Sequence, residues 1–173
     1  VADYGGGTMF LIAGLLAALV EKGRSGRGQV VDAAMVDGVS MLAAPYFGFI
    51  AAGVWREGRG KNLLDSGAPF YDTYECAGGG HVAVACLEPQ FFAEFCRLLP
   101  LPERFAAAQY DRGQWAEMRE AIAARIAQRP RDEWAALFQD TDACVAPVLG
   151  FAEAAAHPHN RARGAHVAVG GLT

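Results

Sequence analysis

The sequence has little excess of charge of either sign and few cysteines. Its 173 residues carry 15 Lys and Arg against 19 Asp and Glu, a net charge of -4. The chain therefore has no bulk electrostatic attraction to nucleic acid or to an anionic membrane, and neither is expected as a partner. The four cysteines show no C-x-x-C pairing, which is typical of reduced, mostly buried thiols. We therefore expect a cytoplasmic protein.

Long apolar runs and metal-binding patterns are also missing. The longest apolar run, Met9 to Val20, spans twelve residues, whereas a bilayer needs about 18 to 20. A core helix is therefore expected, and no membrane span. The one close histidine pair is His157-Pro158-His159, and no carboxylate or cysteine cluster accompanies it, so no metal site is expected. No Ser-His-Asp or Cys-His pattern indicates a hydrolase triad.

Apolar periodicity and glycine- or proline-rich turns predict a mixture of helices and strands. Helices are expected at about 8–22, 33–44, 46–52, 89–99, 114–128, 132–138 and 151–156. Strands are expected at about 29–31, 70–76, 81–86, 144–149 and 166–169. The first helix is apolar all round, so we expect it to be buried on every side. The strands at 70–76 and 81–86 flank a glycine turn and should form a hairpin.

These elements divide the chain into parts of different texture. Residues 1–52 are expected to be helices of a larger domain, and residues 53–68, with four glycines and no periodicity, a linker loop. Residues 69–150 are expected to form a small α+β domain, and residues 151–173 the start of a segment that returns to the large domain. The chain has no initiator Met and no leader pattern, so we expect a piece of a longer protein, cut before Val1 and after Thr173.

Asp3 stands in the stretch with the strongest indication of chemistry, followed by Tyr4 and the run Gly5-Gly6-Gly7. Glycines let a ligand approach the backbone closely, and N–H groups at a helix start can hold a developing oxyanion. A carboxylate beside them can act as a base or as a nucleophile. The alternative interpretation makes Asp3 a helix cap and the glycines packing points. The run is not a dinucleotide- or phosphate-binding fingerprint.

Two further candidates lie near the expected hairpin. Glu88 stands where the second strand turns into the next helix, and it is either a site carboxylate or a helix cap. Tyr71 lies on the opposite face of its strand from Phe70 and Asp72, and it is either a site residue or a half-buried strand aromatic. The residues alone leave these alternatives open.

The chain resembles the family III CoA transferases in three motifs: ADYGGGTM (Ala2–Met9), SGRGQVVD (Ser25–Asp32) and NLLDSGAPFYDTYEC (Asn62–Cys76). Within that superfamily, a fourth motif, EPQFF (Glu88–Phe92), is similar to the alpha-methylacyl-CoA racemases. The resemblance runs from about Ala2 to beyond residue 148. Four motifs in this order are far more specific than any one of them.

The resemblance implies a fold and a set of site residues. The fold is the α/β family III CoA-transferase fold, of which this chain carries helices of the large domain and a small α+β domain. Asp3 matches the catalytic aspartate, and Glu88 matches a glutamate that supports a partner histidine. The residues implied to lie near the substrate are Tyr4, Gly5, Gly6 and Tyr71.

The resemblance also implies an activity. A racemase of this kind is an isomerase of fatty acid metabolism that interconverts (R)- and (S)-2-methylacyl-CoA by removing and returning the alpha proton through an enolate. The substrate is an acyl-CoA thioester, CoA being part of it, so no cofactor is implied, and the full-length protein is an interlocked homodimer. The family's CoA-binding half and a second proton carrier, a histidine before the aspartate, match nothing in this sequence. We therefore expect that the chain alone does not complete a catalytic cycle.

Two alternatives to the racemase stay open. The first is a CoA transferase on the same fold, in which Asp3 is the nucleophile that accepts the acyl group. The second is a non-catalytic fragment, an interaction module whose apolar first helix seeks a partner. The EPQFF motif and the absence of a long glycine-rich transferase loop favour the racemase.

Overall fold

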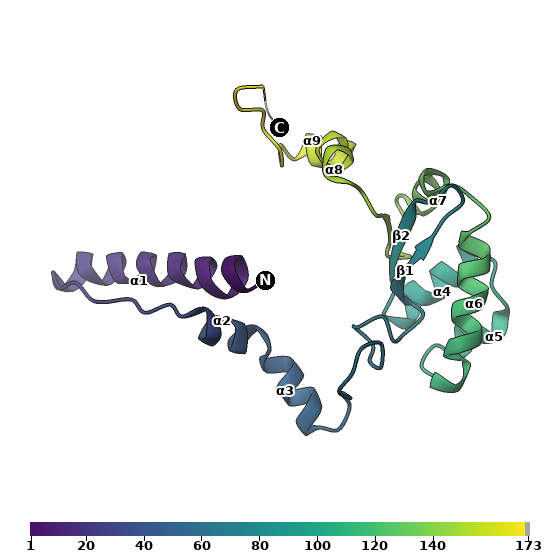
Figure 1. Cartoon of the computed structure of the whole chain (residues 1–173), viewed down its shortest axis with the longest axis horizontal. Coiled ribbons are helices and arrows are strands. Elements are labelled where there is room, and N and C mark those ends of the chain that lie inside the picture. The colour runs from purple at the N-terminus through teal and green to yellow at the C-terminus, as the bar shows by residue number, and fades with distance from the viewer. Residues whose placement is uncertain (172–173) are drawn as a thin grey trace. The chain divides into compact units, whose positions relative to one another are not determined.

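The chain folds as two units, Val1–Glu57 and Gly58–Thr173, and the computed structural model describes residues 1–171. Figure 1 shows helices alone in the first unit, and helices around a small antiparallel sheet in the second. The domain boundaries expected from the sequence stay predictions, and each unit is described by itself.

The first unit begins with η1 (Ala2–Thr8), a π-helix that continues directly into α1 (Met9–Ser25). Gly26 ends α1 in the left-handed conformation, at φ 70°, and its N–H donates to the Lys22 carbonyl, as is common at helix C-termini. Residues 27–34 form an extended segment after α1, and this segment leads to α2 (Met35–Leu42) and α3 (Ala44–Ala51). The strand expected at 29–31 is wrong for the described chain: this segment pairs with no other strand, and Val30 is exposed.

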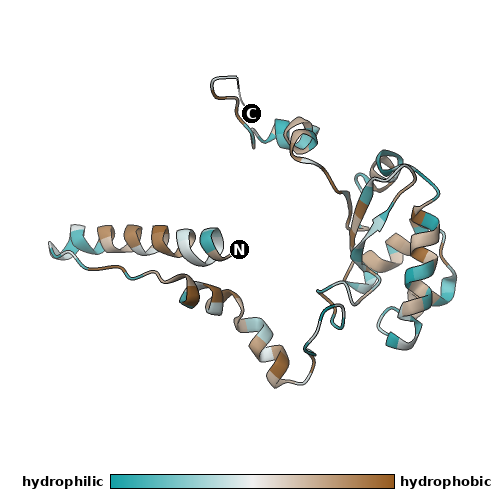
Figure 2. Ribbon diagram, in the orientation of Figure 1, coloured by the Kyte–Doolittle hydropathy of each residue, from teal (hydrophilic) through white to brown (hydrophobic). Residues whose placement is uncertain are grey.

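The expected burial of the first helix is also wrong. No described residue of α1 is buried, and the hydrophobic residues of α1 stand out as brown bands in Figure 2. Beside the helix runs the extended segment that follows it, where Val31 contacts Gly14, and most side chains of α1 stay exposed. The continuous helix Ala2–Ser25 has 24 residues and is long and apolar enough to cross a membrane, although a soluble core helix satisfies the same criterion. The expected lack of a membrane partner stays a prediction.

The second unit is built on a three-stranded antiparallel sheet in the order β1-β2-β3. Its strands are β1 (Tyr71–Glu75), β2 (His81–Ala85) and β3 (Val145–Pro147). Tyr71 pairs with Ala85 and Glu75 pairs with His81, so the expected hairpin is confirmed. The expected strand at 144–149 is confirmed in its central residues.

Five helical segments lie between the hairpin and β3 in the chain. They are α4 (Pro89–Leu98), α5 (Glu103–Ala107), η2 (Arg112–Gln114), α6 (Trp115–Ile126) and α7 (Arg131–Phe138). The core lies between them and one face of the hairpin, where Tyr74, Val82 and Val84 are buried. From the helices, Phe92, Phe95, Met118, Ile122 and Ile126 are each fully buried in the same cluster.

Part of the loop expected to be a linker is packed on the second unit. The Asp65 carboxylate accepts hydrogen bonds from the backbone N–H groups of Asn62 at 2.7 Å and Gly67 at 3.1 Å. Burial raises the pKa of Asp65, but these bonds and the one from the Asn62 side chain outweigh it and lower the pKa. Arg119 forms an ion pair with Asp72 and donates to the Ser66 carbonyl at 2.7 Å. These contacts fix the loop that leads into β1.

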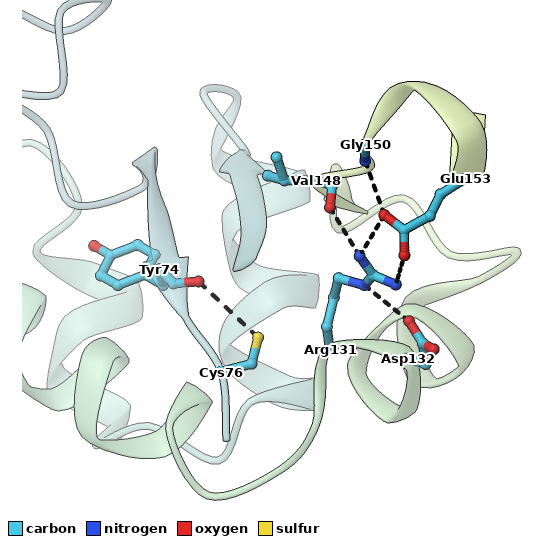
Figure 3. Close-up of polar contacts among 7 residues, drawn as sticks. All are labelled: Tyr74, Cys76, Arg131, Asp132, Val148, Gly150 and Glu153. Atoms are coloured by element: carbon cyan, nitrogen blue, oxygen red, sulfur yellow. Dashed lines mark hydrogen bonds and ion pairs between the residues drawn. The ribbon is translucent and has the colours of Figure 1, made fainter. Parts of the chain in front are cut away.

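The last described elements are α8 (Phe151–Ala156) and α9 (Pro158–Ala162). Arg131 connects α8 to the sheet domain, because its guanidinium donates to Glu153 at 2.7 and 3.0 Å and to the Val148 carbonyl at 3.1 Å (Figure 3). It also pairs with Asp132 at 2.8 Å. The strand expected at 166–169 is wrong within residues 1–171: no named strand covers this segment, and its apolar side chains are exposed.

Candidate active site

Asp3 lies in the first turn of η1, and its side chain is exposed. The N–H of Gly6 donates to the carbonyl of Val1, five residues earlier, at 3.1 Å, which is the π-helical spacing. The Thr8 hydroxyl donates to the Asp3 carbonyl at 2.9 Å. Short π-helical turns are rare in proteins, and those that occur are frequently found at functional sites. The backbone around Asp3 is thus held by hydrogen bonds that leave its carboxylate exposed.

η1 packs on α2 through two glycines. A Cβ on Gly38 would overlap the Gly6 carbonyl oxygen and lie 2.7 Å from the Gly6 carbonyl carbon. A Cβ on Gly6 would lie 2.7 Å from Cγ2 of Val39 and 3.0 Å from the Val39 backbone nitrogen. The two backbones therefore approach more closely than any side chain would permit. This confirms Gly6 as a packing point, and it makes α2 the support of the helix that carries Asp3.

The neighbours of Asp3 on η1 differ in what they offer a ligand. Tyr4 is 80% exposed, so its side chain is accessible. The N–H groups of Gly5 and Gly6 both donate to the Val1 carbonyl, at 2.8 and 3.1 Å. In this structure these two N–H groups are therefore used in hydrogen bonds at the start of the helix. Substrate contacts through Tyr4, Gly5 and Gly6 stay predictions.

Glu88 follows β2 and occupies the N-cap position of α4, with an extended backbone at φ -74° and ψ 142°. Its carbonyl accepts the first helical bond, from the N–H of Phe92 at 3.0 Å. Within the described residues its carboxylate makes no capping hydrogen bond, and the residue is exposed. The helix-cap alternative therefore holds for the backbone of Glu88 but not for its carboxylate.

Tyr71 opens β1 and pairs with Ala85 on β2. It is half-buried, on the opposite face of the strand from the fully buried Phe70 and from Asp72, as the alternation of strand side chains predicts. Ala85 lies three residues before Glu88. Tyr71 and Glu88 therefore lie at the same end of the hairpin, away from its glycine turn.

The candidate residues thus form two groups. The residues of the first unit, all on η1, are Asp3, Tyr4, Gly5 and Gly6. The residues of the second unit, at one end of the hairpin, are Tyr71 and Glu88. The structure brings together the members of each group, and their catalytic and substrate-binding roles stay predictions.

The cysteines and histidines add no second centre among the described residues. Cys76 and Cys86 are buried as expected, Cys96 is half-buried and Cys144 is exposed, and all four thiols are free. Burial raises the pKa of Cys96 to about 12 and also raises the pKa of Cys86, so both stay neutral at pH 7. No group of three or more His, Cys, Asp or Glu side chains in the described chain can hold a metal ion. The expected lack of a metal stays a prediction.

Sequence reasoning missed two side chains that hold the backbone beside Glu88. Gln109 and Tyr110 both donate hydrogen bonds to the carbonyl of Leu87. Their acceptor is a backbone atom that every residue possesses, so no residue pattern marks the pair. The segment between Pro102 and the helix at 114–128 also shows no periodicity that would place them.

A family assignment follows from comparison with known proteins. The model of CoA-transferase family III matches residues 1–171 of this chain. The chain belongs to this family. The match spans both units, so Asp3 and Glu88 lie within the part of the sequence that defines the family.

Among curated family members, the chain is similar to two named racemases. It is 42% identical over 170 residues to alpha-methylacyl-CoA racemase of Mus musculus, covering 98% of this chain and 45% of that protein. It is 39% identical over 167 residues to alpha-methylacyl-CoA racemase of Homo sapiens, covering 96% and 44%. Identity to acetyl-CoA:oxalate CoA-transferase of Acetobacter aceti is 26% over 178 residues, with 99% and 45% covered. The chain thus spans less than half the length of each relative.

Solved structures agree on the fold. The crystal structure of Rv3272 from Mycobacterium tuberculosis superposes with a TM-score of 0.69 at 20% identity, covering 91% of this chain and 42% of that one. At this identity the likeness concerns the fold alone. The expected family III CoA-transferase fold, partial in this chain, is therefore confirmed.

Proposed function

We propose that this chain is the part of an alpha-methylacyl-CoA racemase that carries the catalytic aspartate and a supporting glutamate. The observation that carries the proposal is the 42% and 39% identity to two curated racemases across nearly the whole chain. Identity to the oxalate CoA-transferase is much lower, at 26%. Asp3 and Glu88 are both exposed carboxylates at helix starts, which suits acid–base work on a bound substrate.

In the proposed reaction, Asp3 takes the alpha proton from one face of a 2-methylacyl-CoA thioester, or returns it there. Proton transfer by a positioned carboxylate contributes about 10²- to 10⁴-fold to a rate. The enolate that forms is planar, so reprotonation on the other face inverts the centre. The N–H groups of Gly5 and Gly6 donate to the Val1 carbonyl, and Gly6 is buried against α2, so the proposal assigns these glycines to holding Asp3 in place. Tyr4 and Tyr71 are the proposed side-chain contacts of the substrate.

The proton carrier of the second face is proposed to be a histidine of the complete protein, supported by Glu88. None of His81, His157, His159 and His166 matches the position of that histidine in the family. The CoA-binding half is likewise proposed to belong to the complete protein, which acts as an interlocked homodimer in the cytoplasm, in fatty acid metabolism. The mechanism needs no added cofactor, since the acidity of the alpha proton comes from the thioester itself.

Solvent exchange tests the proposal. The complete protein that carries this chain is incubated with (R)- or (S)-2-methylacyl-CoA in D2O, and mass spectrometry and chiral separation follow the product. Deuterium at the alpha carbon together with inversion is the expected result. Asp3→Asn should reduce both by about 10²-fold or more, whereas Asp37→Asn, which removes an exposed carboxylate in the first turn of α2, should leave them unchanged.

The same experiment identifies the alternative functions. Acyl transfer to an added carboxylic acid without deuterium entry would replace the racemase by a CoA transferase that uses Asp3 as nucleophile. Neither exchange nor transfer by the complete protein would indicate a non-catalytic module.

A further inference from the structure

The peptide unit that precedes Glu88 is held by two side chains from a distant segment. Gln109 is only 4% exposed, and its Nε2 donates to the Leu87 carbonyl at 2.8 Å and to the Cys86 carbonyl at 3.1 Å. The Tyr110 hydroxyl donates to the same Leu87 carbonyl at 2.5 Å. A carbonyl oxygen has two lone pairs, so the Leu87 oxygen is fully engaged by these two donors.

The two donors are themselves fixed. The indole N–H of Trp115 donates to the Gln109 carbonyl at 2.8 Å, and Trp115 is a core residue. The ring of Tyr110 packs edge-on against the fully buried Phe70, with centroids 5.7 Å apart. The next residue, Asp111, accepts the Gly113 N–H at 3.0 Å and caps η2. Gln109 is therefore held inside the core, whereas Tyr110 is 52% exposed and is held by its ring contact with Phe70 and its bond to the Leu87 carbonyl.

Glu88 is also restrained on its C-terminal side. Pro89 follows it at the first position of α4, and a residue before proline is confined to extended conformations. The observed φ of -74° and ψ of 142° lie in that region. With the Leu87 carbonyl fixed on one side and Pro89 on the other, the Glu88 backbone has one orientation. Its exposed side chain, which makes no capping bond with α4 in the described chain, starts from that fixed point.

We propose that Gln109 and Tyr110 are positioning residues for Glu88: their shared grip on the Leu87 carbonyl fixes the direction in which its carboxylate meets the proton-carrying histidine. This inference rests on the proposed racemase function. A glutamate that supports a histidine must keep its hydrogen-bond geometry through both proton transfers. Displacements of about 1 Å at such a group can reduce a rate about 10²-fold.

The variants Gln109→Met and Tyr110→Phe, alone and combined, test the inference in the complete protein. Both keep most of the side-chain volume, and Tyr110→Phe keeps the ring contact with Phe70. Tyr74→Phe is the matched control, because the Tyr74 hydroxyl also donates to a backbone carbonyl, that of Pro69, at 2.5 Å. Glu88→Gln is the reference for loss of the carboxylate itself.

The readout separates positioning from folding, because only one of the two proton carriers depends on Glu88. The double variant and Glu88→Gln should lose inversion by about 10- to 100-fold with KM unchanged. In both, deuterium should still enter the recovered enantiomer whose alpha proton faces Asp3. Loss of folded protein would instead reduce exchange of both enantiomers in proportion. Tyr74→Phe should retain inversion per folded molecule.

Each other outcome overturns the inference in a recognisable way. Loss of inversion in Glu88→Gln with normal inversion in the double variant would show that Glu88 needs no support from these residues. Equal loss of exchange at both faces in the double variant would show that Gln109 and Tyr110 only stabilise the fold. Absence of exchange and inversion in the wild-type protein would refute the racemase proposal, and the inference with it.

Discussion

The substitution Gly38→Ala should disturb the candidate site without touching any proposed catalytic side chain. Gly38 lies in α2 and faces the backbone of Gly6. An added Cβ would overlap the Gly6 carbonyl oxygen and lie 2.7 and 2.9 Å from the Gly6 carbonyl carbon and Cα. Every one of these atoms belongs to the backbone, so no side chain can rotate away. η1, which carries Asp3, must move instead.

The magnitude follows from contact distances. Carbon atoms pack best at about 3.5 to 4.0 Å, so the two backbones must separate by about 1 Å. Overpacking of this kind typically costs about 1 to 3 kcal/mol, and replacing glycine by alanine inside a helix returns up to about 1 kcal/mol. The expected net destabilisation is therefore about 0 to 2 kcal/mol. A shift of about 1 Å at Asp3 should slow alpha-proton exchange about 10²-fold.

Urea unfolding and the D2O exchange assay on the complete protein measure both effects. Gly23→Ala is the matched control, because Gly23 lies inside α1 and a Cβ there meets nothing within 4 Å. It should stabilise the protein by about 0.5 to 1 kcal/mol and leave exchange unchanged. Normal exchange and stability in Gly38→Ala would refute the argument that the glycine contact holds η1 in place.

Three further predictions concern the second unit. The hydrogen bonds from Arg131 and from the Gly150 N–H lower the pKa of Glu153 to about 2, against 4.5 ordinarily. The stability that this carboxylate contributes is therefore fully present above pH 4.5 and is lost as the pH falls through 2. A carboxyl-carbon NMR titration should show the low midpoint, and Arg131→Ala should move it back toward 4.5. Phe95→Ala, at a fully buried site, should lower the free energy of unfolding in urea by about 3 to 5 kcal/mol, whereas Phe151→Ala, at a site that is 99% exposed, should change it by less than about 0.5 kcal/mol; similar losses would contradict the assigned core. Cys144 is the exposed cysteine of the described chain, so mass spectrometry should find it alkylated first by iodoacetamide. Partial burial raises the pKa of its thiol, so the reaction should be slow at pH 7 and faster at pH 9. Earlier reaction of a buried cysteine would contradict this prediction.

The hairpin and the helices α4, α6 and α7 were predictable because their signals are local, whereas the short helix α5 was not predicted. Alternating side chains on both sides of a glycine turn predict β1 and β2, and apolar residues at helical spacing, such as Phe92 and Phe95, predict α4. The position of the half-buried Tyr71 on the face opposite Phe70 follows from the same alternation.

The errors arise where neighbours decide the outcome. An apolar helix is buried only where other elements cover it, and no described residue of α1 is covered enough to be buried. A short β-branched segment such as that around Val30 forms a strand only where a partner strand lies beside it. The close backbone packing of η1 on α2 through Gly6 is likewise something that side-chain periodicity does not report.

The candidate site was predictable to a smaller extent. The family motifs point to Asp3 and Glu88 as single residues, and their catalytic roles stay predictions. The supports of these residues are backbone features: a glycine contact under η1, and a carbonyl held by Gln109 and Tyr110. A sequence shows which side chains are present, but the carbonyl that each of them binds is known only after folding.

The Arg131 contacts have a practical consequence for expressing the second unit alone. A version that stops at the end of β3 would keep the guanidinium but remove Glu153, its bidentate partner. It would also remove Val148, whose carbonyl is a second acceptor for Arg131. The natural C-terminal limit of an independently expressed unit is therefore not the last strand but the far end of α8, at Ala156 or later.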